Sequence, residues 1–230
     1  MSLISLVLPY WQRQAVADRS LALLAKQYAA LDLEVIVVDD GDPVPYLPPA
    51  GMPWPVRVVR LAEKAGPKNS CVPINRGVAE ARGEFIALSG PEMMHHRPVL
   101  AEMRAEIERG GPETYVLAAV WFDEGKTWHV HSTIAGRPVC SVGMPSGSHF
   151  HFMSMMRRGL WDASGGLDEE YRDGAGYDDP DFVKRLERCG ARFVIRDDLV
   201  VEHVRAGARA RWTPEQHERN RALFVSKWAA

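Results

Sequence analysis

The first ninety residues alternate short apolar runs with longer amphipathic segments, and this alternation constrains the fold more than any other feature. The apolar runs predict buried strands at residues 3–8, 34–38, 56–60 and 84–88, the first of them ended by Pro9. Segments 13–31 and 71–82 lie between these runs and place apolar side chains at helical spacing. Apolar strands separated by helices are typical of βαβ units. The sequence therefore predicts an α/β fold with a mainly parallel central sheet flanked by helices.

The second half of the chain is less regular and predicts a smaller mixed region. Helices are expected at 98–109, 180–188 and 214–228, and strands at 115–122, 150–155, 192–195 and 199–202. No linker separates the two halves, and 230 residues with a hydrophobic content of 46% suffice for one large core. We therefore expect a single domain over residues 1–230.

Charge and cysteine content narrow the class of protein. Lys and Arg number 28 against 30 Asp and Glu, so the net charge of −2 indicates no polyanionic partner. Cys71, Cys140 and Cys189 are widely spaced, which is typical of reduced thiols rather than of a disulfide framework. No apolar run approaches the ~18 residues of a membrane span, and the first residues lack the basic segment of a signal peptide. We expect a cytoplasmic protein.

Polar residues follow two of the predicted strands at their carboxyl ends. Asp39 and Asp40 come after the second strand, and residues 89–92 come after the fourth. Ligands of parallel α/β sheets bind beyond the carboxyl ends of the strands. We therefore expect the functional site at this edge.

Four segments in this half also carry a family resemblance. They are Ser5-Leu-Val-Leu-Pro-Tyr-Trp11, Glu34-Val-Ile-Val-Val-Asp-Asp-Gly41, Asn75-Arg-Gly77 and Ala81-Arg-Gly-Glu-Phe-Ile-Ala-Leu88. Their order and spacing over residues 3–95 resemble the start of a family 2 glycosyltransferase with the GT-A (Rossmann-like) fold. The resemblance implies a single GT-A domain, in which residues 1–95 bind a nucleotide sugar, 96–204 carry the acceptor and catalytic side, and 205–230 form a basic tail and helix. It implies transfer of a hexosyl or pentosyl group, most often from a UDP-sugar, to an acceptor hydroxyl.

The resemblance assigns the nucleotide-sugar contacts. Asp40 matches the position that contacts the base, with Asp39 beside it, and Pro9 and Tyr10 line the base pocket. The remaining donor-side residues that it implies are Asn75, Arg76 and Ser89. The residues alone leave other interpretations open, because Asp and Gly also form turns and an Arg on a helix commonly faces solvent.

The usual metal motif is replaced in this chain. The family commonly holds Mn²⁺ or Mg²⁺ with Asp-x-Asp after the fourth strand, whereas this chain has Leu88-Ser-Gly-Pro-Glu92. Some members of the group carry Pro-Glu there, which implies that Glu92 is the metal-binding carboxylate and that Ser89 takes the place of the first Asp. One carboxylate can hold a hard cation when water and phosphate oxygens supply the other positions. The resemblance adds His203, at the end of a late strand; the alternatives are a solvent-facing Glu and a structural His.

Segments 165–171 and 174–182 are similar to the acceptor side of galactosyl- and N-acetylgalactosaminyltransferases. The match implies that Asp179 is the catalytic base of an inverting transfer, with Asp178 beside it. Pro180 suits a first helical turn, so Asp179 is also predicted as the N-cap. Helix amides would then favour the ionised form of Asp179 and lower its pKa. The alternative is a residue that only caps the helix.

The acceptor and two other functional classes stay open. Residues 205–227 carry six Lys or Arg residues, two Glu residues and Trp212. Such a segment fits a nucleic acid with hydroxymethylated bases as acceptor, although a glycan acceptor and a solvated helix face are the commoner outcomes. A metal-dependent nucleotidyltransferase would normally have a Gly-rich loop after the first strand, where this chain has Pro9-Tyr-Trp-Gln-Arg13. A catalytically inactive sugar- or protein-binding module would explain the missing Asp-x-Asp.

Overall fold

The computed structural model describes residues 2–66, 69–122, 127–134, 137–139, 153–204 and 212–228. Its strands are β1 (Ile4–Tyr10), β2 (Leu33–Asp39), β3 (Val56–Arg60), β4 (Phe85–Ser89), β5 (Met93–Met94), β6 (Thr114–Phe122), β7 (Thr127–Ile134), β8 (Arg137–Val139), β9 (Met153–Arg157) and β10 (Arg192–His203). Its helices are α1 (Gln14–Tyr28), α2 (Cys71–Glu80), α3 (Val99–Gly110), α4 (Arg158–Ser164), the 3₁₀ turn η1 (Glu169–Asp173), α5 (Asp178–Arg188) and α6 (Pro214–Trp228). The α/β prediction is confirmed.

One mixed sheet connects the two halves of the chain. The strand order is β3-β2-β1-β4-β9-β6-β10-β5, with β7 beside β6 and β8 beside β7. Strands β1 to β4 are mutually parallel, and β9 runs antiparallel to both β4 and β6. Since β10 is parallel to β6, the carboxyl ends of β1, β2, β4, β6 and β10 meet at one edge. The chain order reverses between β1 and β4, and such a switch point opens a crevice for ligands.

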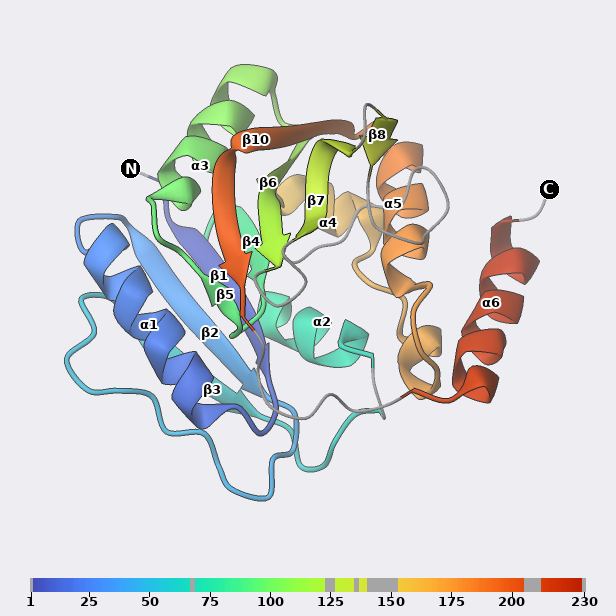
Figure 1. The fold of residues 1–230 in the computed structure, drawn as a ribbon, viewed down its shortest axis with the longest axis horizontal. Helices are drawn as coiled ribbons and strands as arrows, with labels where there is room; N and C mark the ends of the chain where they lie inside the picture. Colours follow the sequence, from blue (N-terminus) through green and yellow to red (C-terminus); the bar gives the residue numbers. More distant parts are fainter. Residues whose placement is uncertain are drawn as a thin grey trace.

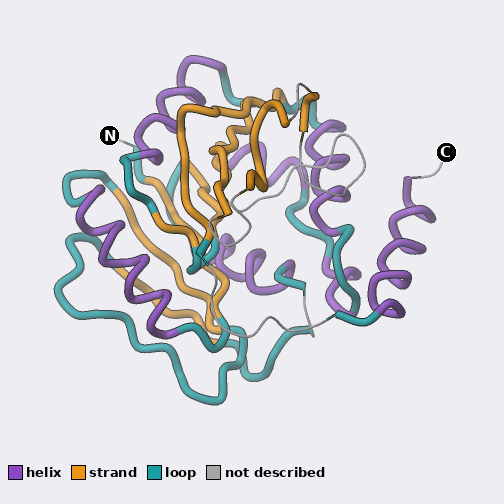
Figure 2. Tube along the Cα trace, in the orientation of Figure 1, coloured by secondary structure: helices purple, strands orange, loops and turns teal. Residues whose placement is uncertain are grey.

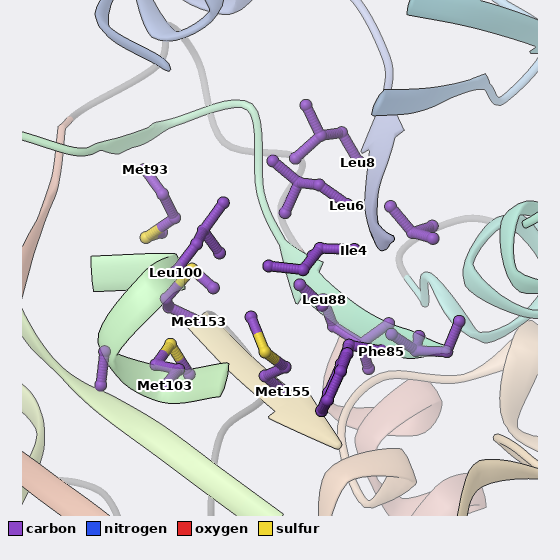
Figure 3. Close-up of a cluster of buried hydrophobic side chains, with 14 of the residues drawn as sticks. Ile4, Leu6, Leu8, Phe85, Leu88, Met93, Leu100, Met103, Met153 and Met155 are labelled. Atoms are coloured by element: carbon purple, nitrogen blue, oxygen red, sulfur yellow. The ribbon is translucent and has the colours of Figure 1, made fainter. Parts of the chain in front are cut away.

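Helices cover both faces of the sheet. Figure 1 shows α1 and α3 on one side, α2, α4 and α5 on the other, and α6 outside α5; Figure 2 shows the same layers. Alternate side chains of β1 serve the two faces, as expected for a strand. Ile4, Leu6 and Leu8 lie in the cluster that Leu100 of α3 completes (Figure 3). On the other face, Gly77 of α2 packs so closely on β1 that a Cβ would collide with Val7.

Two predicted details are wrong. Pro9 does not end the first strand, which continues to Tyr10; β4 pairs only with Ile4–Val7, so the ladder requires no amide from Pro9 on that side. The predicted strands 192–195 and 199–202 form one strand, β10, with a register shift between Arg196 and Val200. The side chain of Arg196 binds Asp198 at 2.7 and 2.8 Å there, so a polar segment that resembles a turn is a bulge.

Two further observations concern the cysteine thiols and the possibility of a membrane-spanning helix. Cys71 and Cys189 are free thiols, and Cys140 lies outside the described residues. Within the parts of the chain that the structure describes, no helix is long and apolar enough to cross a membrane.

Candidate active site

Asp39 lies beneath the carboxyl edge of the sheet and is fully buried. One carboxylate oxygen accepts the amide of Asp42 at 2.8 Å. The other accepts the amide of Tyr46 at 3.1 Å and the guanidinium of Arg60 at 2.6 Å. These contacts hold the turn after β2 in place, so Asp39 supports the backbone beside the predicted base pocket.

Asp40 is nearer to the surface and is 5% exposed. Its carboxylate accepts the Lys64 ammonium at 2.9 Å and the amide of Ala65 at 2.8 Å. Segment 61–66 can reach Asp40 because Gly41, with φ of +68°, has no Cβ, and a Cβ there would collide with the backbone of residues 63 and 64. Lys64 also lies 4.5 Å from the ring of Trp11. Asp40, Lys64 and Trp11 thus form one polar and aromatic cluster at the ends of β1 and β2.

Tyr10 and Pro9 end β1 at the same edge. Tyr10 is buried, and its ring lies 4.5 Å from that of Tyr46. Burial raises the pKa of the Tyr10 hydroxyl, and nearby acidic side chains raise it to a smaller extent. Tyr10 therefore stays neutral at physiological pH and presents a ring rather than a charge.

The Asn75-Arg76-Gly77 motif connects the two halves of the molecule. Asn75 donates to the carbonyl of Leu167 at 2.7 Å and accepts the amide of the same residue at 3.0 Å. Arg76 is exposed and forms an ion pair with Glu80 at 3.0 Å. In the described structure Asn75 positions the loop around Leu167, and the predicted donor contacts of Asn75 and Arg76 stay predictions.

Glu92 and His203 meet between the ends of β4 and β10. Strand β5 pairs His203 with Met93, and the amide of Val204 donates to the carbonyl of Glu92 at 3.1 Å. The His203 Nε2 atom lies 3.6 Å from Glu92 Oε1. The same carboxylate oxygen binds Arg13, the N-cap residue of α1, at 2.7 Å. The strand pairing thus brings together two residues that are more than a hundred positions apart.

This pair fits a divalent cation only in part. Glu92 Oε2 is buried and has no hydrogen-bond partner among the described residues, which suits a further electropositive ligand. An oxygen and an imidazole nitrogen are donors that Mn²⁺ accepts, whereas Mg²⁺ favours oxygen alone. Within the described ranges no three His, Cys, Asp or Glu side chains cluster around a common point. Ser89, buried nearby, donates to the Gly90 carbonyl at 3.4 Å. The remaining coordination would have to come from the substrate and water.

Asp178 and Asp179 begin α5, and this corrects the predicted helix start. The N-cap is Tyr177 in a left-handed conformation, not Asp179. Burial raises the pKa of Asp178 to about 6, although its own helix amides and the side chain of Asn69 favour the ionised form. Burial, and then the charge of Asp178, raise the pKa of Asp179 well above its ordinary value. The expected lowering of the Asp179 pKa is therefore wrong, because desolvation and like charge outweigh the helix amides.

Asp181, one turn further along α5, has a different role. It is fully buried and accepts Arg185 Nε at 2.7 Å, Trp228 Nε1 at 2.7 Å and the Tyr171 hydroxyl at 3.2 Å. These bonds fasten α5 to η1 and α6. Asp181 is therefore a structural carboxylate.

Sequence reasoning missed Arg13, Lys64 and Asn69 as members of this edge. Arg13 and Lys64 are basic residues that follow the ends of β1 and β3, and that position is the signal that could have identified them. Asn69 precedes α2, accepts the amide of Cys71 at 2.9 Å and lies beside Asp178. No local pattern marks Asn69, because its neighbour comes from the other half of the chain.

Comparisons with known proteins agree with this architecture. A family model described as glycosyl transferase family 2 matches residues 5–166. GalNAc-T7, solved with UDP, GalNAc and Mn²⁺, is similar at a TM-score of 0.74 and 13% identity, over 100% of this chain and 49% of that one. A search of curated proteins returned no match.

Two further solved structures resemble the chain. TarS of S. aureus has a TM-score of 0.65 and 16% identity, over 98% of this chain and 39% of that one. The mannosyltransferase PcManGT from Pyrobaculum calidifontis, solved with GDP-Man and Mn²⁺, has a TM-score of 0.62 and 14% identity, over 99% of this chain and 70% of that one. The chain spans 39% of TarS and 60% of a TarS fragment, residues 1–349. These similarities confirm the predicted GT-A fold.

Proposed function

The chain belongs to glycosyl transferase family 2, and from that premise we propose that it transfers a sugar from a nucleotide sugar to an acceptor hydroxyl, with Asp179 as base. The observation that carries the proposal is the carboxylate pair at the start of α5. A carboxyl group with its pKa raised by burial is a stronger proton acceptor than an ordinary one. Because the two groups influence each other, their protons belong to the pair, and the first is lost at about pH 6.

The proposed reaction is a single displacement. The acceptor hydroxyl oxygen attacks the anomeric carbon while Asp179 takes its proton, and the bond from that carbon to the diphosphate oxygen breaks on the opposite side. The nucleoside diphosphate leaves with the bonding electrons, and the anomeric configuration inverts. Asp178 would hold a second acceptor hydroxyl. Since α5 fixes the direction of both side chains, positioning contributes to the rate together with basicity.

For the donor we propose a UDP-sugar first. Asp40 would accept a hydrogen bond from the uracil N–H or a ribose hydroxyl, because a carboxylate has acceptor capacity beyond its bonds to Lys64 and Ala65. Tyr10 and Trp11 would bound the base. Two of the similar proteins were solved with UDP or with GDP-Man, which supports a nucleotide donor without choosing the base.

Glu92 and His203 would hold a divalent cation, Mn²⁺ more readily than Mg²⁺, when donor oxygens complete its coordination. Such an ion supplies charge neutralisation for the departing diphosphate. Arg13 lies on the same carboxylate and at the start of α1. Its guanidinium would contact the diphosphate and so share the neutralisation.

Nucleotide binding tests the proposal at its donor half. UDP, GDP and UDP-sugars at about 100 times their dissociation constants should stabilise the fold by about 2.7 kcal/mol, seen as a rise in Tm that Mn²⁺ enlarges. Asp40→Ala should remove most of that rise. Asp32→Ala, at the other end of β2 and exposed, is the matched control and should keep it.

The outcomes separate the alternatives. If no nucleoside diphosphate raises the Tm under any metal condition, the donor assignment is wrong and the sugar- or protein-binding module is favoured. A nucleotidyltransferase would instead be protected by nucleoside triphosphates and release pyrophosphate. Transfer of the sugar with inversion, followed by NMR of the anomeric proton, supports the proposed reaction.

A further inference from the structure

A row of aromatic side chains links α6 to the start of α5. The Tyr177 ring lies 5.6 Å from that of Phe224 and 5.1 Å from that of His217. The row continues to Trp212, whose ring lies 5.1 Å from His217 at an interplanar angle of 31°. Trp212 is 51% exposed, which is unusual for the largest apolar side chain. We call Tyr177, His217 and Trp212 the aromatic row.

The row is held against the proposed acceptor side by α6. Asn220, fully buried, donates to the carbonyls of Tyr171 at 3.0 Å and Gly176 at 2.8 Å. The amide of Ala175 donates to the carbonyl of Gln216 at 3.1 Å. These bonds fix α6 on the segment that leads into Asp178. The row therefore ends one residue before the carboxylate pair.

Tyr177 has an unfavourable backbone for its residue type. Its φ is +66°, in the region where Gly or Asn is the usual residue, and among the described residues only Gln12 shares this property outside glycine. A bulky residue is strained in this conformation, which points to a role for the ring. The ring is the side chain that connects α5 to the rest of the row.

The Lys and Arg side chains of α6, which the structure describes, favour a neutral ligand. Each basic side chain of α6 forms an ion pair with a carboxylate: Arg219 with Asp173 at 3.3 Å, Arg221 with Glu218 at 2.7 Å, and Lys227 with Asp168 at 2.5 Å. A nucleic acid needs uncompensated Lys and Arg for its phosphates. The other three basic residues of the tail, at 205, 209 and 211, lie outside the described residues.

We propose that the aromatic row is the acceptor subsite, and that it stacks on the apolar face of an uncharged pyranose whose hydroxyl then reaches Asp179. The proposal rests on the proposed glycosyl transfer and specifies its acceptor as a neutral glycan rather than a nucleobase. Aromatic rings offer dispersion contacts to the C–H face of a sugar, while the sugar hydroxyls stay in water or bind the carboxylates.

The test uses methyl glycosides as probes on the full chain. Methyl α- and β-glycosides of glucose, galactose, mannose and N-acetylglucosamine are offered at millimolar concentration, and saturation-transfer NMR and tryptophan fluorescence report binding. At least one glycoside should bind the wild type. Its dissociation constant should rise about tenfold or more in Trp212→Ala and in His217→Ala. Val225→Ala, an exposed position on the same helix, is the matched control and should bind as the wild type does.

The readouts distinguish this proposal from the reaction on which it rests. UDP protection is measured in the same variants and reports the donor side alone, and the hydrolysis of a UDP-sugar by water is measured in Val225→Ala, where it should be unchanged. If glycosides bind none of the proteins, or bind wild type and Trp212→Ala equally, the subsite is wrong even if UDP still protects. If a single-stranded oligothymidylate binds the wild type and Trp212→Ala removes that binding, the acceptor is a nucleic acid and the proposal is overturned.

Discussion

Two pairs of adjacent aspartates lie at the same edge of the sheet in opposite electrostatic states. Asp39 and Asp40, at the end of β2, each bind a cation and backbone amides: Arg60 for the first and Lys64 for the second. Asp178 and Asp179, at the start of α5, are partly buried together, and burial raises the pKa of both. In the sequence both pairs are the same dipeptide, Asp-Asp.

The comparison shows that the partners of a carboxylate, rather than its residue type, decide what it can do. A carboxylate held by cations and amides is fixed in place and is suited to support a pocket or accept a further hydrogen bond. A desolvated pair holds a proton more tightly and is suited to exchange one near neutral pH. Under the proposed function, donor recognition and proton transfer would therefore be assigned to two different carboxylate pairs.

Asp179→Asn should produce the largest effect among the substitutions considered. If it does not, the proposed contrast between the two aspartate pairs fails. The variant keeps the size of the side chain and removes the proton acceptor, so turnover should fall by about 10²–10⁴. Steady-state transfer assays measure this, and calorimetry with UDP should find donor affinity nearly unchanged. Asp162→Asn, exposed on α4, is the control and should retain full turnover.

Turnover of Asp179→Asn within a few-fold of the wild type would remove the distinction between the pairs. The base would then be Asp178, since Asp181 is buried in structural bonds, or the reaction would retain the anomeric configuration without such a base. Analysis of the product anomer separates these two cases.

Glu92→Gln tests the proposed metal-binding carboxylate. Loss of the charge should weaken Mn²⁺ affinity in the presence of UDP by at least about tenfold. Isothermal titration of Mn²⁺ into protein with UDP measures it. Glu80→Gln, which removes only the partner of Arg76 on the surface of α2, should leave the affinity unchanged. Equal affinity in wild type and Glu92→Gln would exclude Glu92 from the metal site.

Stability gives the smallest effect but the sharpest contrast, because the two pairs should respond with opposite signs. The folded pKa of Asp178 is about 6, above the unfolded value of about 3.9. Its contribution to stability is therefore fully present below about pH 4 and is lost as the pH rises through about 6. Asp178→Asn should raise the free energy of unfolding by about 1–3 kcal/mol at pH 7 and change it little at pH 4.

Asp40→Asn should instead lower the free energy of unfolding at pH 7 by about 1 kcal/mol, because it weakens the bond to Lys64. Urea unfolding of both variants at pH 4 and pH 7 measures the pair of effects. Destabilisation by both substitutions at pH 7 would contradict the contrast.

The elements that the sequence predicts well are those with one uninterrupted pattern. Continuous apolar runs identify β2 and β3, and helical spacing identifies α3 and α6 to within a residue. Strand ends and topology then suffice to place Asp40 at the ligand edge, since parallel strands share it. The family resemblance paired Glu92 with His203, and their 3.6 Å separation agrees with it.

The remaining features depend on contacts between distant segments. Strands β7 and β8 lie in a segment without periodicity, and β10 carries a polar bulge that resembles a turn. The ion pair of Lys64 with Asp40 requires the loop after β3 to fold back over Gly41. The raised pKa of Asp178 depends on burial beside Asn69, which is contributed by the other half of the chain. No local pattern carries this information.

The position of β9 has a consequence for the order in which the protein can assemble. Strand β9 separates β4 from β6 and hydrogen-bonds to both, yet it follows β4 in the chain by more than sixty residues. While the chain emerges from the ribosome, β4 can pair with β1 on one side, but its other edge has no native partner until residues 153–157 have been made. An open apolar edge of this kind is prone to pair with other chains. The first half of the nascent chain therefore depends on the second half to close its sheet, and synthesis exposes that edge for the whole interval.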